Sequence, residues 1–153
     1  MFRCLLLSIY LTTMSATDTP NILIIDDDRL HLTLYAWILG RQGYRCQTAL
    51  VGSSSVDLSG VDLPAADMPA NGAVDLVLLD YRLNSSVTAV EIARDLRKRL
   101  GSIPIVVLSE VEWMPDDMRG HAAAFVHKGD PKFLLDTVAA TLQGKDSEGK
   151  SSQ

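Results

Sequence analysis

The stretch NILIIDDD (residues 21–28) decides the fold, because a short apolar run ends there abruptly in three aspartates. Three later stretches share this design of an apolar run followed at once by polar residues: DLVLLDYRL (75–83), IPIVVLSE (103–110) and AAAFVHKGDP (122–131). Short, continuous apolar runs are typical of strands buried on both faces, which is how strands lie in a parallel sheet. The sequence therefore predicts an α/β protein built on a parallel sheet.

The polar residues that end these runs form a candidate site. The carboxyl ends of parallel strands share one edge of the sheet, and ligands bind at that edge. The four runs bring to it Asp26, Asp27, Asp28, Asp80, Ser109 and Lys128. Carboxylates, a hydroxyl and an ammonium together suit a divalent cation and a phosphoryl group, because Mg²⁺ prefers oxygen ligands and is often held by carboxylates plus phosphate.

Helix signals lie between the runs. The first helix is predicted to end at Arg41. Its inward face is expected to hold Leu30, Leu34, Trp37 and Ile38. Thr88 and Glu91 match a capping box that opens another helix, and Asp130 with Pro131 opens the last one. The predicted strands are residues 21–25, 44–49, 74–79, 103–108 and 123–127.

One domain accounts for most of the chain. Its 153 residues are 47% hydrophobic and 22% charged, as in a typical globular domain, which we predict to cover residues 20–144. Residues 1–19 are interpreted as an N-terminal extension in which Met14 is the initiator, so that residues 1–13 are not translated. A membrane-tethering extension is the alternative. Residues 145–153 are polar and predicted to be a disordered tail.

Residues 52–73 fit the pattern least well. Pro64, Pro69 and many small residues interrupt helical periodicity there. We expect a short helix plus a flexible insertion, and we interpret the insertion as a tolerated loop rather than a partner contact.

The order and spacing of the four motifs resemble the receiver domain of two-component response regulators, in its stand-alone form. The resemblance implies a doubly wound, five-stranded parallel sheet of flavodoxin-like order 2-1-3-4-5, with helices on both faces. It implies a cytoplasmic phosphorelay protein that takes a phosphoryl group from a histidine kinase or a histidine phosphotransfer protein and signals to a downstream protein. Such a protein is not an enzyme with turnover on free substrates. No membrane partner is expected, and the net charge of −5 argues against nucleic acid.

The resemblance also implies roles for the acidic residues. Asp80 would accept the phosphoryl group. Mg²⁺ would be bound by Asp27, Asp80 and the backbone carbonyl of Arg82, with Asp26 acting through water. Asp28 is interpreted as a surface residue that opens the first helix.

A switch is implied as well. Ser109 and Lys128 would each contact a phosphoryl oxygen. Ser109 would move inward on phosphorylation and vacate space for Phe125, whose alternative is an ordinary core aromatic. The surface formed by helix 4 (the short helix near residues 115–120), the strand at residues 123–127 and the last helix, which begins at Pro131, would then change, with Trp113 as a contact. Helix 4 is expected to be short and weak, near residues 115–120.

Some positions depart from the receiver pattern. Glu110 stands where receivers have a small residue, and Gly129 stands where they have proline. The loop NSSVTA (84–89) lacks the usual proline and glycine. Arg82 and Val111 occupy positions that influence the lifetime of the phosphoryl group. These departures bear on the rate and lifetime of phosphorylation rather than on its site. His31, His121 and His127 show no ligand spacing, and we predict no role for them.

Three other functions compete with this one. An FMN carrier shares the sheet order, but three aspartates would repel the FMN phosphate after the first strand. A haloacid-dehalogenase-type phosphatase needs a further strand with paired acids after Lys128, and this chain has one helix and a tail there. The remaining alternative is a pseudo-receiver, a protein-interaction module with the same fold that is not phosphorylated. Glu110 and the altered loops favour it.

Overall fold

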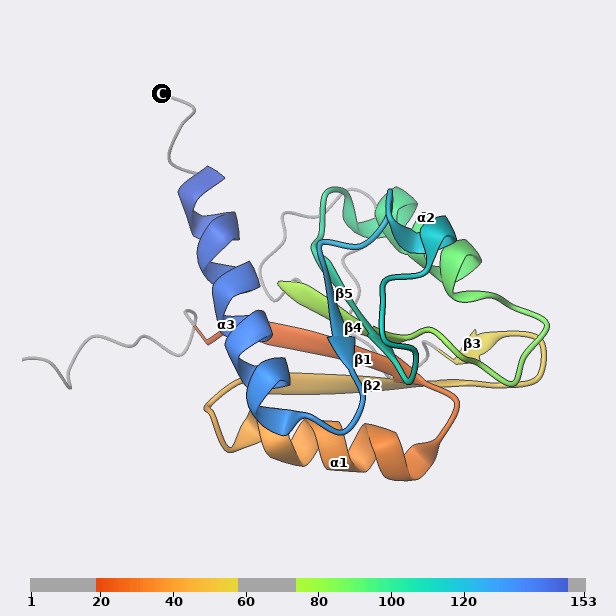
Figure 1. The fold of residues 1–153 in the computed structure, drawn as a ribbon, viewed down its shortest axis with the longest axis horizontal. Helices are drawn as coiled ribbons and strands as arrows, with labels where there is room; N and C mark the ends of the chain where they lie inside the picture. Colours follow the sequence, from red (N-terminus) through yellow and green to blue (C-terminus); the bar gives the residue numbers. More distant parts are fainter. Residues whose placement is uncertain (1–18, 58–73, 149–153) are drawn as a thin grey trace, which may run out of the picture.

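The structure is a computed structural model that describes residues 19–57 and 74–148. Within them lies a six-stranded sheet of order β3-β2-β1-β4-β5-β6 (Figure 1). Its strands are β1 (Asn21–Asp26), β2 (Arg45–Val51), β3 (Val56–Asp57), β4 (Leu76–Asp80), β5 (Ile105–Ser109) and β6 (Ala124–His127). All neighbouring strands pair in parallel except β2 and β3, which pair antiparallel. The predicted parallel order is therefore confirmed.

The sheet has one strand more than predicted, because the chain folds back after β2. The N–H of Gly52 donates to the carbonyl of Ser55 at 2.7 Å, and this turn lets β3 pair antiparallel with β2 through Val56 opposite Val51. Serine and glycine favour such a turn, and Val56 packs against the core. The helix expected in residues 52–73 is therefore absent from residues 52–57, and residues 58–73 lie outside the described part of the chain.

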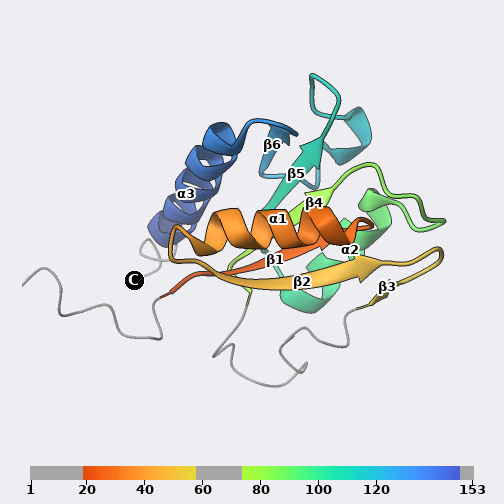
Figure 2. The same ribbon diagram turned by 90° about the horizontal axis from the view of Figure 1, so that it is seen from below.

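Helices cover both faces of the sheet (Figures 1 and 2). Helices α1 (Arg29–Gly40) and α3 (Pro131–Glu148) pack on one face, and α2 (Ala89–Leu100) with the 3₁₀ turn η1 (Asp116–Met118) packs on the other. All residues of β1, β4 and β5 are buried, because successive side chains enter the two cores alternately. This double burial explains why these strands show no polar alternation.

Helix α1 buries a different face from the predicted one. Its buried residues are Leu32, Tyr35 and Leu39. The residues predicted to face inward, Leu30, Leu34 and Trp37, are 77%, 48% and 60% exposed, and Ile38 is half-buried. Both sets have helical spacing, so periodicity alone could not choose between them. The face that is buried is the one that packs against the sheet, where Leu32, Tyr35 and Leu39 join the core.

Helix α2 forms as predicted. The N–H of Glu91 donates to the Thr88 hydroxyl at 3.3 Å, and the N–H of Thr88 donates to the Glu91 carboxylate at 2.8 Å. Gly101 follows the helix with φ of 72°, a left-handed conformation that suits glycine. The inward face consists of Ala89, Ile92, Ala93 and Leu96, with Leu100 partly buried.

Two other elements end differently from what the pattern indicates. The short helix expected near residues 115–120 is only the single turn η1. Helix α3 continues past Gly144 to Glu148, so the predicted tail begins later than residue 145. A glycine inside a helix costs roughly 1 kcal/mol relative to alanine, which a packed helix tolerates. Residues 1–18 and 149–153 lie outside the described residues, and so do the predicted initiator Met14 and the end of the predicted tail. Among the described helices, none has the length and apolar character needed to cross a membrane.

Candidate functional site

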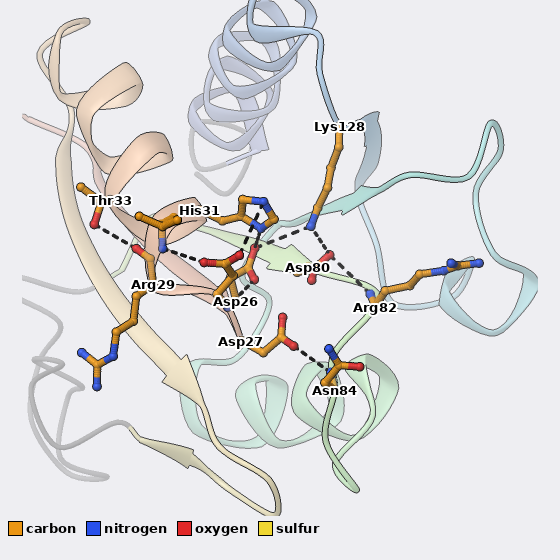
Figure 3. Close-up of polar contacts among 11 residues, drawn as sticks. Asp26, Asp27, Arg29, His31, Thr33, Asp80, Arg82, Asn84 and Lys128 are labelled. Atoms are coloured by element: carbon orange, nitrogen blue, oxygen red, sulfur yellow. Dashed lines mark hydrogen bonds and ion pairs between the residues drawn. The ribbon is translucent and has the colours of Figure 1, made fainter.

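The polar residues that end the buried strands meet at one edge of the sheet, as predicted. Asp26 ends β1, Asp80 ends the adjacent β4, and Ser109 ends β5. Lys128 directly follows β6. Figure 3 shows the Lys128 side chain reaching back over the sheet edge to the aspartates.

Three carboxylates lie close together at this edge. One oxygen from each of Asp26, Asp27 and Asp80 lies within 4.8 Å of the others. Burial raises the pKa of Asp26 to about 6. The hydrogen bond from the N–H of Asp28 lowers this pKa, and the nearby negative charge of Asp80 raises it. Burial also raises the pKa of Asp80, against the opposing effect of Lys128. A cluster of this kind gains from a cation, since the carboxylates repel one another without one.

Lys128 neutralises part of this charge. Its ammonium Nζ lies 2.9 Å from Oδ1 of Asp80 and 3.7 Å from Oδ2 of Asp26. Burial disfavours the ammonium, but its hydrogen bond with Asp80 and the surrounding carboxylates outweigh burial and raise the pKa of Lys128. The lysine is therefore charged, and it is held against the proposed phosphoacceptor.

Asp27 is the most accessible of the three acids. The backbone N–H of Asn84 donates to its Oδ2 at 2.9 Å. Burial alone would raise the pKa of Asp27, but this hydrogen bond and its interaction with Asp26 lower it. Asp27 is thus ionised and open to a cation. The contact of Asn84 with Asp27 was not predicted, because an asparagine in a polar loop carries no distinctive signal.

Arg82 lies beside Asp80. Its backbone N–H donates to Oδ1 of Asp80 at 3.4 Å, and its exposed side chain points away from the carboxylates (Figure 3). The role expected for its backbone carbonyl as a metal ligand stays a prediction.

Ser109 is fully buried at the end of β5. Its Oγ accepts the N–H of Val111 at 3.2 Å, so the hydroxyl proton can still be donated to another group. Glu110, expected beside the pocket, has an exposed side chain. Its carbonyl lies 3.0 Å from Nε2 of His127, a contact that joins the ends of β5 and β6.

Phe125 lies in β6 on the face covered by α2 and η1, where it is partly buried against the core that contains Met118. Trp113 is 69% exposed in the segment before η1. Both places are compatible with a switch and with an ordinary packing role, so the switch stays a prediction.

Asp28 opens α1, as predicted. Its Oδ1 accepts the N–H of Leu30 at 2.7 Å, which caps the helix. Asp28 also donates its own N–H to Oδ1 of Asp26 at 2.9 Å. The cap therefore fixes one oxygen of the buried carboxylate.

His31 belongs to the site, although no role was predicted for it. Its Nδ1 lies 3.3 Å from Oδ2 of Asp26, and its Nε2 lies 4.0 Å from Oδ2 of Asp28. His31 therefore has two carboxylate neighbours, which ligand spacing in the sequence does not reveal. Its position in the first turn of α1 places it five residues after Asp26, a separation that no strand-end motif reveals.

The site fits a hard divalent cation. Oδ2 of Asp26 is buried and has no hydrogen-bond partner among the described residues, which is costly unless a further group contacts it. Asp26, Asp27 and Asp80 offer only oxygen donors, the kind of ligand that Mg²⁺ prefers.

No protein-family model and no curated protein matches the sequence. Solved structures do match. A CheY-like receiver domain protein from Methanospirillum hungatei JF-1 is 20% identical, with a TM-score of 0.66 over 85% of this chain and 98% of that one. The chemotaxis protein CheY4 of Vibrio cholerae is 20% identical, with a TM-score of 0.64 over 80% and 98% of the two chains. The response regulator TrrA of Thermotoga maritima, solved in complex with Mg²⁺ and BeF, is 22% identical, with a TM-score of 0.59 over 80% and 99%.

Each of these structures matches along nearly its whole length. In this chain the parallel sheet and the helices on its two faces carry the aspartates and Lys128 to one edge. The chain therefore has the fold of the CheY-like receiver domains of response regulators.

Proposed function

We propose that this protein is a phosphorelay receiver that accepts a phosphoryl group on Asp80. The observation that carries the proposal is the pairing of Asp80 with Lys128 at 2.9 Å, beside two further carboxylates. A structural ion pair would have no need for Asp26 and Asp27 at the same place, since both add negative charge. A site that holds a cation and a phosphoryl group needs all four side chains.

In the proposed reaction, an oxygen of Asp80 attacks the phosphorus atom of a phosphohistidine, or of a small acyl phosphate. The new P–O bond forms as the bond to the donor nitrogen or oxygen breaks, and the donor leaves with that electron pair. Lys128 turns from Asp80 to a phosphoryl oxygen, and the Ser109 hydroxyl donates to another. Asp27 and Asp80, with the carbonyl of Arg82 and with Asp26 acting through water, would hold Mg²⁺, which would neutralise the charge that develops on the phosphoryl oxygens.

A structural change caused by phosphorylation would pass from the site to the elements next to Asp80. The hydroxyl of Tyr81 donates to the carboxylate of Asp117 in η1 at 3.2 Å, so the residue after the phosphoacceptor contacts this turn directly. Phe125 packs against the core that contains Met118 of η1, and Trp113 lies in the segment before η1. We infer that η1, β6 and α3 form the surface that a downstream protein reads. The phosphodonor would be a histidine kinase or a histidine phosphotransfer protein of the cytoplasm.

Incubation with acetyl phosphate and Mg²⁺, followed by intact mass spectrometry, tests the proposal. The wild type should gain one phosphoryl group, and Asp80→Asn should gain none. Asp136→Asn is the matched control, because Asp136 is an exposed acid paired with Lys132 on α3. Loss of labelling with EDTA would show the need for the cation. Beryllofluoride, the ligand present in the TrrA structure, gives an independent readout: when it is bound at Asp80, it should block labelling by acetyl phosphate.

The alternative is a pseudo-receiver that binds a partner without being phosphorylated. The reduction of helix 4 to the single turn η1 favours it, because this is the part of the molecule expected to report phosphorylation. A wild-type protein that takes no phosphoryl group from acetyl phosphate, and binds no beryllofluoride with Mg²⁺, would establish this alternative. Labelling that persists in Asp80→Asn would instead move the acceptor to another residue.

A further inference from the structure

The carboxylate of Asp26 is fixed on one side only. Its Oδ1 accepts the N–H of Asp28 at 2.9 Å. Its Oδ2 is buried without a hydrogen-bond partner among the described residues. Asp26 as a whole is 1% exposed, so bulk water cannot satisfy this oxygen. Either a bound group or a nearby side chain must do so.

Two side chains approach this oxygen. Nζ of Lys128 is 3.7 Å away and is already bonded to Asp80 at 2.9 Å. Nδ1 of His31 is nearer, at 3.3 Å, and is itself buried without a partner in the described structure. Two unsatisfied buried atoms of complementary kind therefore face each other. Figure 3 shows the imidazole lying against the Asp26 carboxylate.

The imidazole is held in this direction by its surroundings. It projects from the first turn of α1, and its ring lies 6.2 Å, between centroids, from the buried ring of Tyr35 one turn later. Its other nitrogen faces the exposed side of the site, 4.0 Å from Asp28. A ring confined in this way can fix the orientation of a carboxylate that holds a metal or its water, as outer-shell partners do in metal sites.

We propose that His31 is a positioning residue, whose Nδ1–H donates to Oδ2 of Asp26 and orients this carboxylate toward the cation. The proposal rests on the proposed function for the identity of the cation, Mg²⁺. The role of His31 goes beyond the proposed function, because it makes the Mg²⁺ affinity of the site depend on a residue outside the strand-end motifs. Lys128 is thereby left for Asp80 and the phosphoryl group.

Mg²⁺ affinity measured by titration calorimetry tests the proposal without phosphorylation. His31→Leu should weaken Mg²⁺ binding by about 10- to 100-fold. His31→Asn should restore binding close to the wild-type value, because an asparagine amide can place its N–H where Nδ1 lies. His31→Gln should not, because its amide lies where Nε2 would be. His121→Leu is the matched control, since His121 precedes β6 at the opposite end of the sheet, and it should bind Mg²⁺ like the wild type.

Two further readouts separate positioning from a purely structural role. At saturating Mg²⁺ the labelling rate of His31→Leu should return close to that of the wild type, so the defect lies in affinity. In metal-free wild type, ¹⁵N NMR of the imidazole should show a proton on Nδ1. The proposal would be overturned if the proton were on Nε2 alone, or if the wild type bound no Mg²⁺. It would also be overturned if His31→Leu bound Mg²⁺ like the wild type, or if His31→Asn bound it as weakly as His31→Leu. Failure of Asp80 labelling alongside His31-dependent Mg²⁺ binding would refute only the phosphoryl-transfer function.

Discussion

At the scale of single residues, the ionised carboxylate of Asp26 destabilises the folded protein. Its pKa is raised from 3.8 to about 6, first by burial and then by the charge of Asp80. The folded protein therefore binds a proton at Asp26 more tightly than the unfolded chain does. Where the folded state binds more protons, stability falls as the pH rises. Ionised Asp26 therefore lowers the free energy of unfolding; this effect is absent below about pH 4 and fully present above about pH 6.

We therefore expect Asp26→Asn to stabilise the metal-free protein at pH 8 by about 1–3 kcal/mol, since each pKa unit corresponds to about 1.4 kcal/mol. The asparagine keeps the oxygen that accepts the N–H of Asp28. Urea unfolding in EDTA at pH 8 and at pH 4 measures the effect, which should nearly vanish at pH 4. Asp136→Asn serves as the control, and an equal gain at both pH values would contradict the electrostatic explanation.

The strand-end residues of the site could be predicted from sequence, and its helix and loop residues could not. Asp26, Asp80 and Ser109 directly follow apolar runs and Lys128 comes one residue after such a run, so the parallel sheet alone brings them to one edge. His31 reaches the site through the rotation of α1, which depends on packing against the sheet. Asn84 and Asp28 act through backbone N–H groups, and every residue except proline has one.

At the scale of elements, α1 shows why the pattern was misleading. The helix has apolar residues on two faces, and only one can lie on the sheet. Leu39 is fully buried, whereas Leu34 is 48% exposed. A fully buried leucine contributes through transfer from water and through close packing, while a half-exposed one contributes much less.

Replacing these two leucines separates the faces. Leu39→Ala should cost about 2–5 kcal/mol in the free energy of unfolding, and Leu34→Ala should cost within about 0.5 kcal/mol. Chemical denaturation of the two variants under the same buffer conditions provides the measurement. Similar losses for both would mean that the outer face of α1 is covered in the protein.

The other differences from prediction also arise at this scale. The strand β3 forms because a Gly-Ser turn lets Val56 return to the edge of the sheet, a pairing that depends on a contact rather than on periodicity. The sequence does predict η1 as weak, and the structure reduces it to one turn. Helix α3 runs past Gly144, because a glycine inside a helix costs only roughly 1 kcal/mol and does not by itself end the helix.

At the scale of the whole molecule, the site ties four strands together through charge. Asp26, Asp80, Ser109 and Lys128 come from β1, β4, β5 and the end of β6, and the carboxylates that would hold the cation lie at the ends of β1 and β4, which are neighbours in the sheet. Any ligand that binds the folded state and not the unfolded chain stabilises it by mass action. The stability of the fold should therefore report on the site directly.

We expect Mg²⁺ at about 100 times its dissociation constant to stabilise the fold by about 2.7 kcal/mol at pH 8, which is roughly 10 °C in Tm for a domain of this size. At pH 5 the gain should be smaller at the same Mg²⁺ concentration, because protons compete for Asp26, whose pKa is about 6. Thermal unfolding followed by circular dichroism, with and without Mg²⁺ at both pH values, measures this linkage.

Asp27→Asn should lose most of the Mg²⁺ effect while keeping its fold, because Asp27 is half-exposed and is not part of either core. An equal shift in Asp27→Asn would place the cation elsewhere on the molecule. A shift that is the same at pH 5 and pH 8 would mean that Asp26 does not take part in binding it.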